Sequence, residues 1–265
     1  MEEKKVLSKK KEINPRDVTI CEATEQMLEK AKRDGVETAF DRAANMKACP
    51  IGADSACCKH CSMGPCRLSS KDPYGKVGVC GATIDTIMSR NFARMVASGS
   101  AAHTDHGMSM LDLFREVVNG NITDYEIKDP NKLEEVASSI GIEVEGREIN
   151  DIAMDLYKEL ERTYTQVEGE IPFAKRVPEK TLETWRKLGI VPRGAMREIM
   201  ELMHRTHMGV DQDYENITTQ INRTALADGW GGSMVATEIS DILFGTPSPV
   251  SVEVNMGVLK EDHVN

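Results

Sequence analysis

The chain has 265 residues, enough for one large domain or two ordinary domains, each with its own hydrophobic core. Its 33 Lys and Arg against 43 Asp and Glu give a formal charge of -10, which argues against a surface for nucleic acid or anionic membrane. Hydrophobic residues at 40% and charged residues at 29% exclude a disordered or fibrous chain. No run approaches the roughly 20 apolar residues that span a bilayer, and no apolar signal segment follows the Lys-rich start. We therefore expect no transmembrane segment and a cytoplasmic protein.

Helical patterns dominate the chain up to Gly245. A helix is predicted after Pro15, because apolar residues recur there at near-helical spacing: Val18, Cys21, Leu28 and Ala31. Gly35 ends this helix. Because free cysteine is among the most buried residue types, we expect Cys21 to be a buried core thiol. Further helices, to a total of about nine, are predicted over 83–98, 108–119, 131–140, 149–164, 179–188, 195–208 and 217–243.

The pattern changes near the end of the chain. After Thr246-Pro247-Ser248-Pro249, the valines at 250, 252 and 254 alternate with polar residues, which indicates a strand. A lone strand cannot stabilise itself, so this segment predicts the beginning of an α/β domain. The predicted fold is mainly α, with the first strand of a truncated, Rossmann-like α/β domain at the end. Its parts are an arm and first helix (1–48), a cysteine loop (49–81), a helical domain (82–245) and the start of the α/β domain (246–265).

Six of the 7 cysteines are crowded into one loop, at positions Cys49, Cys57, Cys58, Cys61, Cys66 and Cys80. In a reducing compartment such crowding indicates metal binding rather than disulfides. The CxxC step from Cys58 to Cys61 lets two thiolates converge on one centre. Gly64, Pro65 and Gly78 supply the tight backbone that brings Cys66 and Cys80 to the same place. Four thiolates are the usual number for a [4Fe-4S] cluster.

The adjacent residues Cys57 and Cys58 predict a second site. Two neighbouring side chains do not easily point at the same small centre, so one of them serves elsewhere. The remaining pair, Cys49 and Cys57, supplies only two thiolates, and a two-fold symmetric dimer would present that pair twice. We therefore predict a homodimer with a shared cluster on its axis. Whether this cluster is [4Fe-4S] or [2Fe-2S] is left open, because both use four thiolates.

Zinc and unligated thiols are the alternatives for this loop. A zinc site of four cysteines usually has two CxxC-like pairs separated by a longer loop. This sequence has one such pair and two single cysteines, and zinc would leave Cys49 and Cys57 unused. Oxidised or purely structural thiols are the third interpretation. The iron-sulfur interpretation is the one that we favour.

The cysteine loop also resembles a known family. The runs Cys57-Cys58-Lys59-His60-Cys61-Ser62-Met63-Gly64-Pro65-Cys66-Arg67 and Gly78-Val79-Cys80-Gly81-Ala82 closely resemble the N-terminal cluster domain of the anaerobic nickel-iron carbon monoxide dehydrogenases. The likeness continues at 101–107, 228–233, 244–247 and 255–257. It implies an intrasubunit [4Fe-4S] cluster on Cys58, Cys61, Cys66 and Cys80, and a cluster shared across the dimer on Cys49 and Cys57.

The resemblance implies a function as well. That family oxidises CO with water to CO2, two protons and two electrons, and runs the reverse reaction. Both clusters there carry electrons between a buried Ni-Fe-S active cluster and a ferredoxin-like partner. Whether an acetyl-CoA synthase subunit attaches as a further partner is left open. The active-cluster ligands lie further on in the family than this chain extends. We therefore expect an electron-transfer and dimerisation domain that cannot turn over CO by itself.

Two other functions remain as alternatives. A hybrid-cluster protein, which reduces hydroxylamine, belongs to the same superfamily, but its N-terminal cysteine spacing should differ and it should lack the extra pair Cys49 and Cys57. A stand-alone electron carrier or assembly module made of this fragment is the other alternative.

Two pairs of histidines stand three residues apart. His103 and His106 would be neighbours on a helix and could share a proton path. Family members are thought to have a histidine ladder here, but the next steps in this chain are Ser109 and Asp112. The alternative is that both are polar residues at a helix start, bonded to the backbone. The second pair, at 204 and 207, is interpreted as structural.

Two further features have a functional and a structural interpretation. The segment 228–232, Asp-Gly-Trp-Gly-Gly, could mark a passage for a small molecule, but we favour close packing of helices. Arg67, next to Cys66, either tunes a cluster through its charge or is a solvated surface residue.

Overall fold

The computed structural model describes residues 13–248. The described residues divide into two compact units, with the boundary between Pro50 and Ile51. The strand predicted at 250–254 lies outside the described residues. The described helical elements and the small sheet confirm the mainly α prediction.

The first unit contains a short 3-10 helix, η1 (Pro15–Asp17), and the helices α1 (Glu22–Arg33) and α2 (Ala39–Asn45). A capping box begins α2: Thr38 Oγ1 accepts from the Asp41 backbone N–H, and Asp41 Oδ2 accepts from the Thr38 N–H. The prediction of a buried Cys21 is wrong. Cys21 is exposed and is the N-cap residue of α1, a charged helix with no buried residue. The apolar stripe around it is therefore too weak to form a core.

The second unit begins with the short helix α3 (Pro50–Ala53), which crosses the boundary between the units, and a two-stranded sheet, β1 (Cys57–Cys58) and β2 (Cys66–Arg67). After the sheet, the elements of its described residues are all helical. They are α4 (Ile84–Val118), α5 (Pro130–Ser139), α6 (Ile149–Thr165), the 3-10 helix η2 (Pro172–Arg176), α7 (Glu179–Leu188), α8 (Ala195–Arg205), α9 (Tyr214–Ala227), the π-helical segment η3 (Asp228–Ser233) and α10 (Met234–Phe244).

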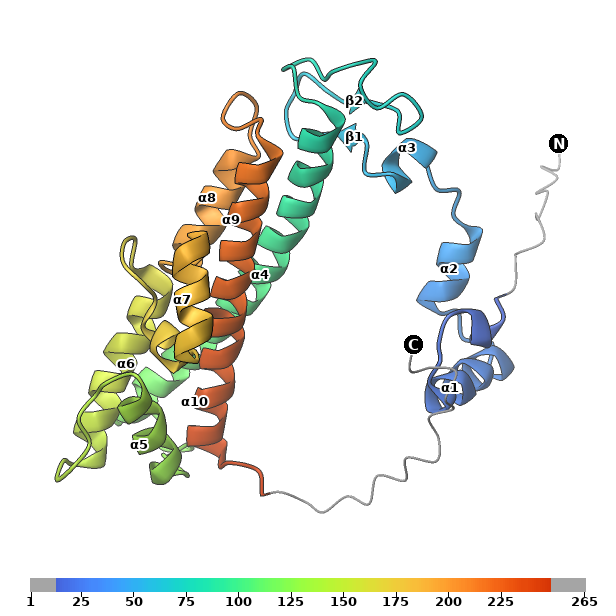
Figure 1. The fold of residues 1–265 in the computed structure, drawn as a ribbon. Coiled ribbons are helices and arrows are strands. Elements are labelled where there is room, and N and C mark those ends of the chain that lie inside the picture. The colour runs from blue at the N-terminus through green and yellow to red at the C-terminus, as the bar shows by residue number, and fades with distance from the viewer. Residues whose placement is uncertain (1–12, 249–265) are drawn as a thin grey trace. The chain divides into compact units, whose positions relative to one another are not determined.

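Helix α4 is the spine of this unit and packs against α6, α8, α9, η3 and α10 (Figure 1). The sequence predicts two helices here, whereas the structure has one helix of 35 residues, which Thr83 caps at its start. It stays helical through Gly107, where a Cβ would stand only 2.9 Å from the Gly232 carbonyl oxygen. The glycine at 107 therefore permits close helix packing and does not end the helix.

Three hydrophobic clusters contain residues of α4. The largest one joins its C-terminal half to α5, α6 and α10 through buried residues that include Phe114, Leu133, Leu156 and Ile239. A second joins its N-terminal half to α8 and α9 through Ala93, Ala97, Leu202, Ile217 and Ile221. The start of α4 belongs to a further cluster, in which Ile84 and Ile87 pack against Ala82 and against Ala56, Cys58 and Leu68 of the cysteine loop.

The segment η3 interrupts the single helix that the sequence predicts over 217–243. A Cβ at Gly232 would lie 3.1 Å from the carbonyl carbon of His103 and 3.1 Å from the backbone nitrogen of Thr104. A Cβ at Gly231 would lie 3.3 Å from the Thr163 Cγ2. The close-packing interpretation of these two glycines is confirmed. Gly229 has no such neighbour within 4 Å, so it does not share this role.

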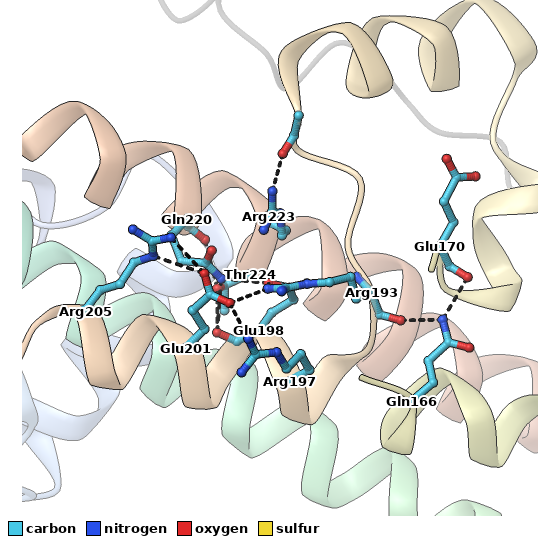
Figure 2. Close-up of polar contacts among 11 residues, drawn as sticks. Gln166, Glu170, Arg193, Arg197, Glu198, Glu201, Arg205, Gln220, Arg223 and Thr224 are labelled. Carbon is cyan, nitrogen blue, oxygen red and sulfur yellow. Dashed lines mark hydrogen bonds and ion pairs between the residues drawn. The ribbon is translucent and has the colours of Figure 1, made fainter. Parts of the chain in front are cut away.

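A polar network ties α8 to α9 and to the loop before α8 (Figure 2). Glu198 is fully buried and accepts from the backbone and the guanidinium of Arg193 and from Gln220 Nε2. Glu201 pairs with Arg193, Arg197 and Arg205. Burial raises the pKa of Glu201, but hydrogen bonds and charge from Arg193 and Arg205 outweigh burial and bring it to about 2.

Candidate metal centre

The sheet sets the directions of the first cysteines. Strands β1 and β2 are antiparallel, with Cys57 opposite Arg67 and Cys58 opposite Cys66. Successive side chains on a strand point to opposite faces. The adjacent cysteines therefore face different sides, with Cys58 buried and Cys57 partly exposed. This agrees with the argument that the two do not serve the same centre.

Four of the predicted ligands come together around one pocket: Cys58, Cys61, Cys66 and Cys80. The rest of its lining is His60, Gly78, Val79, Ala82, Ile87, Arg90 and Met208. Cys57 is not part of the lining. Cys49 is exposed and belongs to the other unit.

The loop before α4 closes tightly around Cys66. The Gly78 N–H donates to the Ala82 carbonyl at 2.8 Å, and the Val79 N–H donates to Cys66 Sγ at 3.4 Å. A Cβ at Gly64 would lie 3.1 Å from both the Cys58 carbonyl oxygen and the Cys66 backbone nitrogen. Glycine is therefore required for the close approach of β1 and β2 at this turn.

Arg90 is the residue at this pocket that the sequence analysis missed. It lies on α4, is only 1% exposed, and its Nη1 is 3.7 Å from Cys80 Sγ. Burial raises the pKa of the Cys80 thiol, but the backbone hydrogen bond from Ala82 and the hydrogen bond and charge of Arg90 outweigh it and lower the pKa. A thiolate at Cys80 is thus favoured. The sequence did contain a signal for its burial, because Arg90 stands on the same helical face as the apolar residues Ile87, Ala93 and Ala97.

His60 lies between two of the predicted ligands but is engaged elsewhere. Its Nε2 is 2.9 Å from Asn91 Oδ1, and Asn91 Nδ2 donates to the carbonyls of Ser55 and Cys57. Burial and the positive charges of Arg94 and Arg90 lower the pKa of His60, although the bond to Asn91 opposes them. A neutral His60 therefore anchors the loop to α4.

The chemistry of the pocket fits an iron-sulfur cluster. Within residues 13–248, no three His, Cys, Asp or Glu residues are positioned to hold one metal ion. What the pocket offers instead is four sulfur donors around its wall, a backbone N–H directed at Cys66 Sγ and a buried cation at Cys80. Four cysteine thiolates with hydrogen bonds to sulfur are the usual ligands of a [4Fe-4S] cluster.

The structure places the candidate proton-path histidines on the middle of α4. Both His103 and His106 are exposed, and His103 Nδ1 lies 2.9 Å from Asp228 Oδ1 on η3. The alternative that they are residues at a helix start is wrong, because α4 begins at Ile84. His204 and His207 are exposed near the end of α8, and Arg67 is exposed beside the pocket.

No helix within the described range, 13–248, combines the length and apolar character needed to cross a membrane.

Comparisons with known proteins identify relatives of the chain. Residues 56–265 match the Prismane/CO dehydrogenase family. Carbon monoxide dehydrogenase 1 of Methanosarcina mazei is 47% identical over 251 residues, 93% of this chain and 40% of that protein. The carbon monoxide dehydrogenase/acetyl-CoA synthase subunit beta of Moorella thermoacetica is 41% identical, over 94% of this chain and 38% of that protein.

Solved structures show the same likeness. A crystal structure of carbon monoxide dehydrogenase from Thermococcus sp. AM4 superposes with a TM-score of 0.82 at 41% identity, covering 96% of this chain and 41% of that chain. An acetyl-CoA synthase/carbon monoxide dehydrogenase structure gives a TM-score of 0.81 at 39% identity, over 90% of this chain and 36% of that chain.

A helical unit with a four-cysteine pocket at the start of its longest helix defines a candidate iron-sulfur protein. With these matches, the chain belongs to the Prismane/CO dehydrogenase family. It spans about two fifths of the length of the curated relatives that it matches.

Proposed function

We propose that this chain is the electron-transfer and dimerisation part of a nickel-iron-sulfur carbon monoxide dehydrogenase, which converts CO and water to CO2, two protons and two electrons, and back. The observation that carries the proposal is the convergence of Cys58, Cys61, Cys66 and Cys80 on one pocket in a chain of this family. These four thiolates would hold a [4Fe-4S] cluster, which supplies one-electron transfer when bound.

The opposite face of β1 supports a second centre. Cys57 points away from the pocket side of the strand, and Cys49 is the other cysteine of the loop that does not line the pocket. The two would hold an iron-sulfur cluster together with the same pair of a second copy, so the proposal includes a homodimer. The Ni-Fe-S active cluster would be held by ligands outside this chain, and residues 246–265 would begin a Rossmann-like domain.

The partners follow from the same proposal. Electrons would pass to a ferredoxin-like acceptor, and the relative of Moorella thermoacetica, named as a subunit of carbon monoxide dehydrogenase/acetyl-CoA synthase, supports an acetyl-CoA synthase subunit as a further partner. Thiolate-held clusters fit a reducing compartment, so we place the protein in the cytoplasm.

His103 is proposed to move protons. Its contact with Asp228 orients the ring, and His106 follows three residues later on the same helix. In a full-length protein that oxidises CO, His103→Gln should slow turnover and leave the iron content unchanged. Unchanged turnover would contradict the relay.

The experiment that tests the main proposal is metal analysis of anaerobically purified chain, with its mass in solution. One [4Fe-4S] cluster within each chain contributes about four iron per chain, and each chain of a dimer holds half of the shared cluster. We therefore expect about six iron per chain if the shared cluster is [4Fe-4S], and about five if it is [2Fe-2S]. About one zinc with little sulfide would contradict it. The chain alone should not oxidise CO, and measurable oxidation would contradict the assignment of the active-cluster ligands to another part of the protein.

A further inference from the structure

We propose that Arg90 is a positioning and charge-compensating residue that raises the reduction potential of the centre held by Cys58, Cys61, Cys66 and Cys80. The inference rests on the proposed function, because it requires an iron-sulfur cluster in this pocket. It adds a role for a residue outside the cysteine loop.

The surroundings of Arg90 are unusual for a buried cation. Its Nη1 lies 3.7 Å from Cys80 Sγ, its Nη2 donates to the Asp211 carbonyl, and its Nε has no hydrogen-bond partner within the described part of the chain. Neither of the two acceptors is a carboxylate. A guanidinium that is 1% exposed is costly to bury without a negative charge nearby. The thiolates of the pocket can supply this charge, because Cys80 Sγ is in contact with the guanidinium.

The turn between α8 and α9 holds Arg90 and Cys80 together. The Asp211 carbonyl accepts from Arg90, while Gln212 Nε2 donates to the Cys80 carbonyl at 2.7 Å. Thr86 Oγ1, one turn before Arg90 on α4, donates to the Gln212 carbonyl at 2.6 Å. One turn thus fixes the backbone of the ligand and the side chain of the cation.

The same turn is anchored on its other side. The Asp211 carboxylate pairs with Arg205 Nη1 at 2.7 Å, and Arg205 also pairs with Glu201 of the α8 network (Figure 2 shows Arg205 and Glu201). The guanidinium of Arg90 is therefore held in place before any ligand binds. A preorganised charge costs no rearrangement when the charge of its target changes.

The sign of the effect follows from charge. One-electron reduction adds one negative charge to a cluster, and a nearby buried cation stabilises the reduced form more than the oxidised form. Net charge and hydrogen bonds to sulfur are among the factors that set cluster potentials. Arg67 provides a comparison, since it also neighbours a ligand, Cys66, but is exposed, so water screens its charge.

The test is a redox titration of the reduced-cluster EPR signal, with dithionite as electron donor, in anaerobically purified chain. Every sample carries Cys57→Ser, which under the proposed function removes the shared centre and leaves one signal. Arg90→Met should shift the potential downward, Arg90→Lys should shift it less, and Arg67→Met should leave it close to the parent value. An unchanged potential in Arg90→Met at full iron content, or equal shifts in Arg90→Met and Arg67→Met, would overturn the inference.

A measurement on the parent chain covers the case in which Arg90→Met fails to assemble. With 15N-labelled arginine, pulsed EPR of the reduced protein should detect a 15N coupling from the guanidinium, and Arg90→Lys should abolish that coupling. A cluster without the coupling would overturn the role of Arg90 and leave the proposed function intact. A parent chain that binds no iron and sulfide would overturn both.

Discussion

The imidazole Nδ1 of His103 lies 2.9 Å from Oδ1 and 3.1 Å from Oδ2 of Asp228, and this contact joins the middle of α4 to η3. A carboxylate accepts hydrogen bonds, so this contact favours the tautomer with the hydrogen on Nδ1, in which Nε2 is the acceptor. The contact thus prepares the ring for the relay proposed above.

The tautomer of His103 provides a prediction about Asp228. Asp228→Asn replaces an acceptor-only group by one that can also donate, so the Nδ1–H tautomer should become less populated. The 15N chemical shifts of histidine-labelled protein would report this change. Asp105→Asn, at an exposed position of the same helix, is the control and should leave the shifts of His103 unchanged. Equal spectra for Asp228→Asn and the parent would contradict the orienting role.

The close approach of η3 to α4 predicts different effects for two glycines. Gly232→Ala places a methyl group 3.1 Å from backbone atoms of residues 103 and 104, so the helices must separate. We expect a loss of about 1–3 kcal/mol in the free energy of unfolding, as for overpacked cores. Gly229→Ala has space around it and should keep or slightly raise stability, since Ala is the better helix former. Denaturant titration of both variants tests this, and a reversed order would contradict the packing.

The buried network on α8 predicts a large effect at Arg193. Arg193→Met leaves the fully buried carboxylate of Glu198 without its guanidinium partner and should lower the free energy of unfolding by about 3–5 kcal/mol. Arg186→Met breaks a pair of similar geometry with Glu170, but both side chains are exposed, so its effect should be small. Equal losses in denaturant titration would show that burial does not govern the contribution of these pairs.

Glu201 predicts how stability depends on acid. Its pKa is about 2 in the folded state against 4.5 as the ordinary value, so the folded state binds fewer protons than the unfolded state at intermediate pH. The stability it contributes is complete above about pH 4.5 and is lost as the pH falls toward 2. Glu201→Gln should therefore flatten the decline of the free energy of unfolding below pH 4.5.

The control for this experiment is Glu145→Gln, at an exposed position. Neither substitution changes a ligand of the proposed centre, so loss of that centre in acid would affect both variants alike. An equally steep acid decline in the two variants would contradict the role of Glu201.

Much of the helical fold could be predicted from the sequence, because apolar periodicity reports which face of a segment is buried. The predicted helix over 179–188 has the same limits as α7. Periodicity does not show where neighbouring helices pack closely against a helix. The continuity of α4 through Gly107 and the π-helical turn at 228–233 were therefore missed. Those features depend on contacts with Tyr164 and with residues 103 and 104, distant in the sequence.

The candidate site was predicted through the spacing of its cysteines, since the ligands lie close together in the sequence. The structure brings Cys58, Cys61, Cys66 and Cys80 around one pocket. Arg90 could not be assigned in the same way, because its placement depends on the Asp211 carbonyl, contributed 121 residues later. The prediction that Cys21 is buried was wrong. Its position on the apolar face of a predicted helix was taken as a sign of burial, but α1 has no buried residue and forms no core.

The most direct measurement is the iron and acid-labile sulfide content of three serine variants in anaerobically purified chain, compared with the parent. Cys66→Ser should lose about four iron per chain, Cys57→Ser about one or two with loss of the shared centre, and Cys21→Ser none. This pattern would confirm one centre held within the chain and one shared between two copies. Iron content that is the same in Cys66→Ser and Cys21→Ser would contradict a cluster in the four-cysteine pocket.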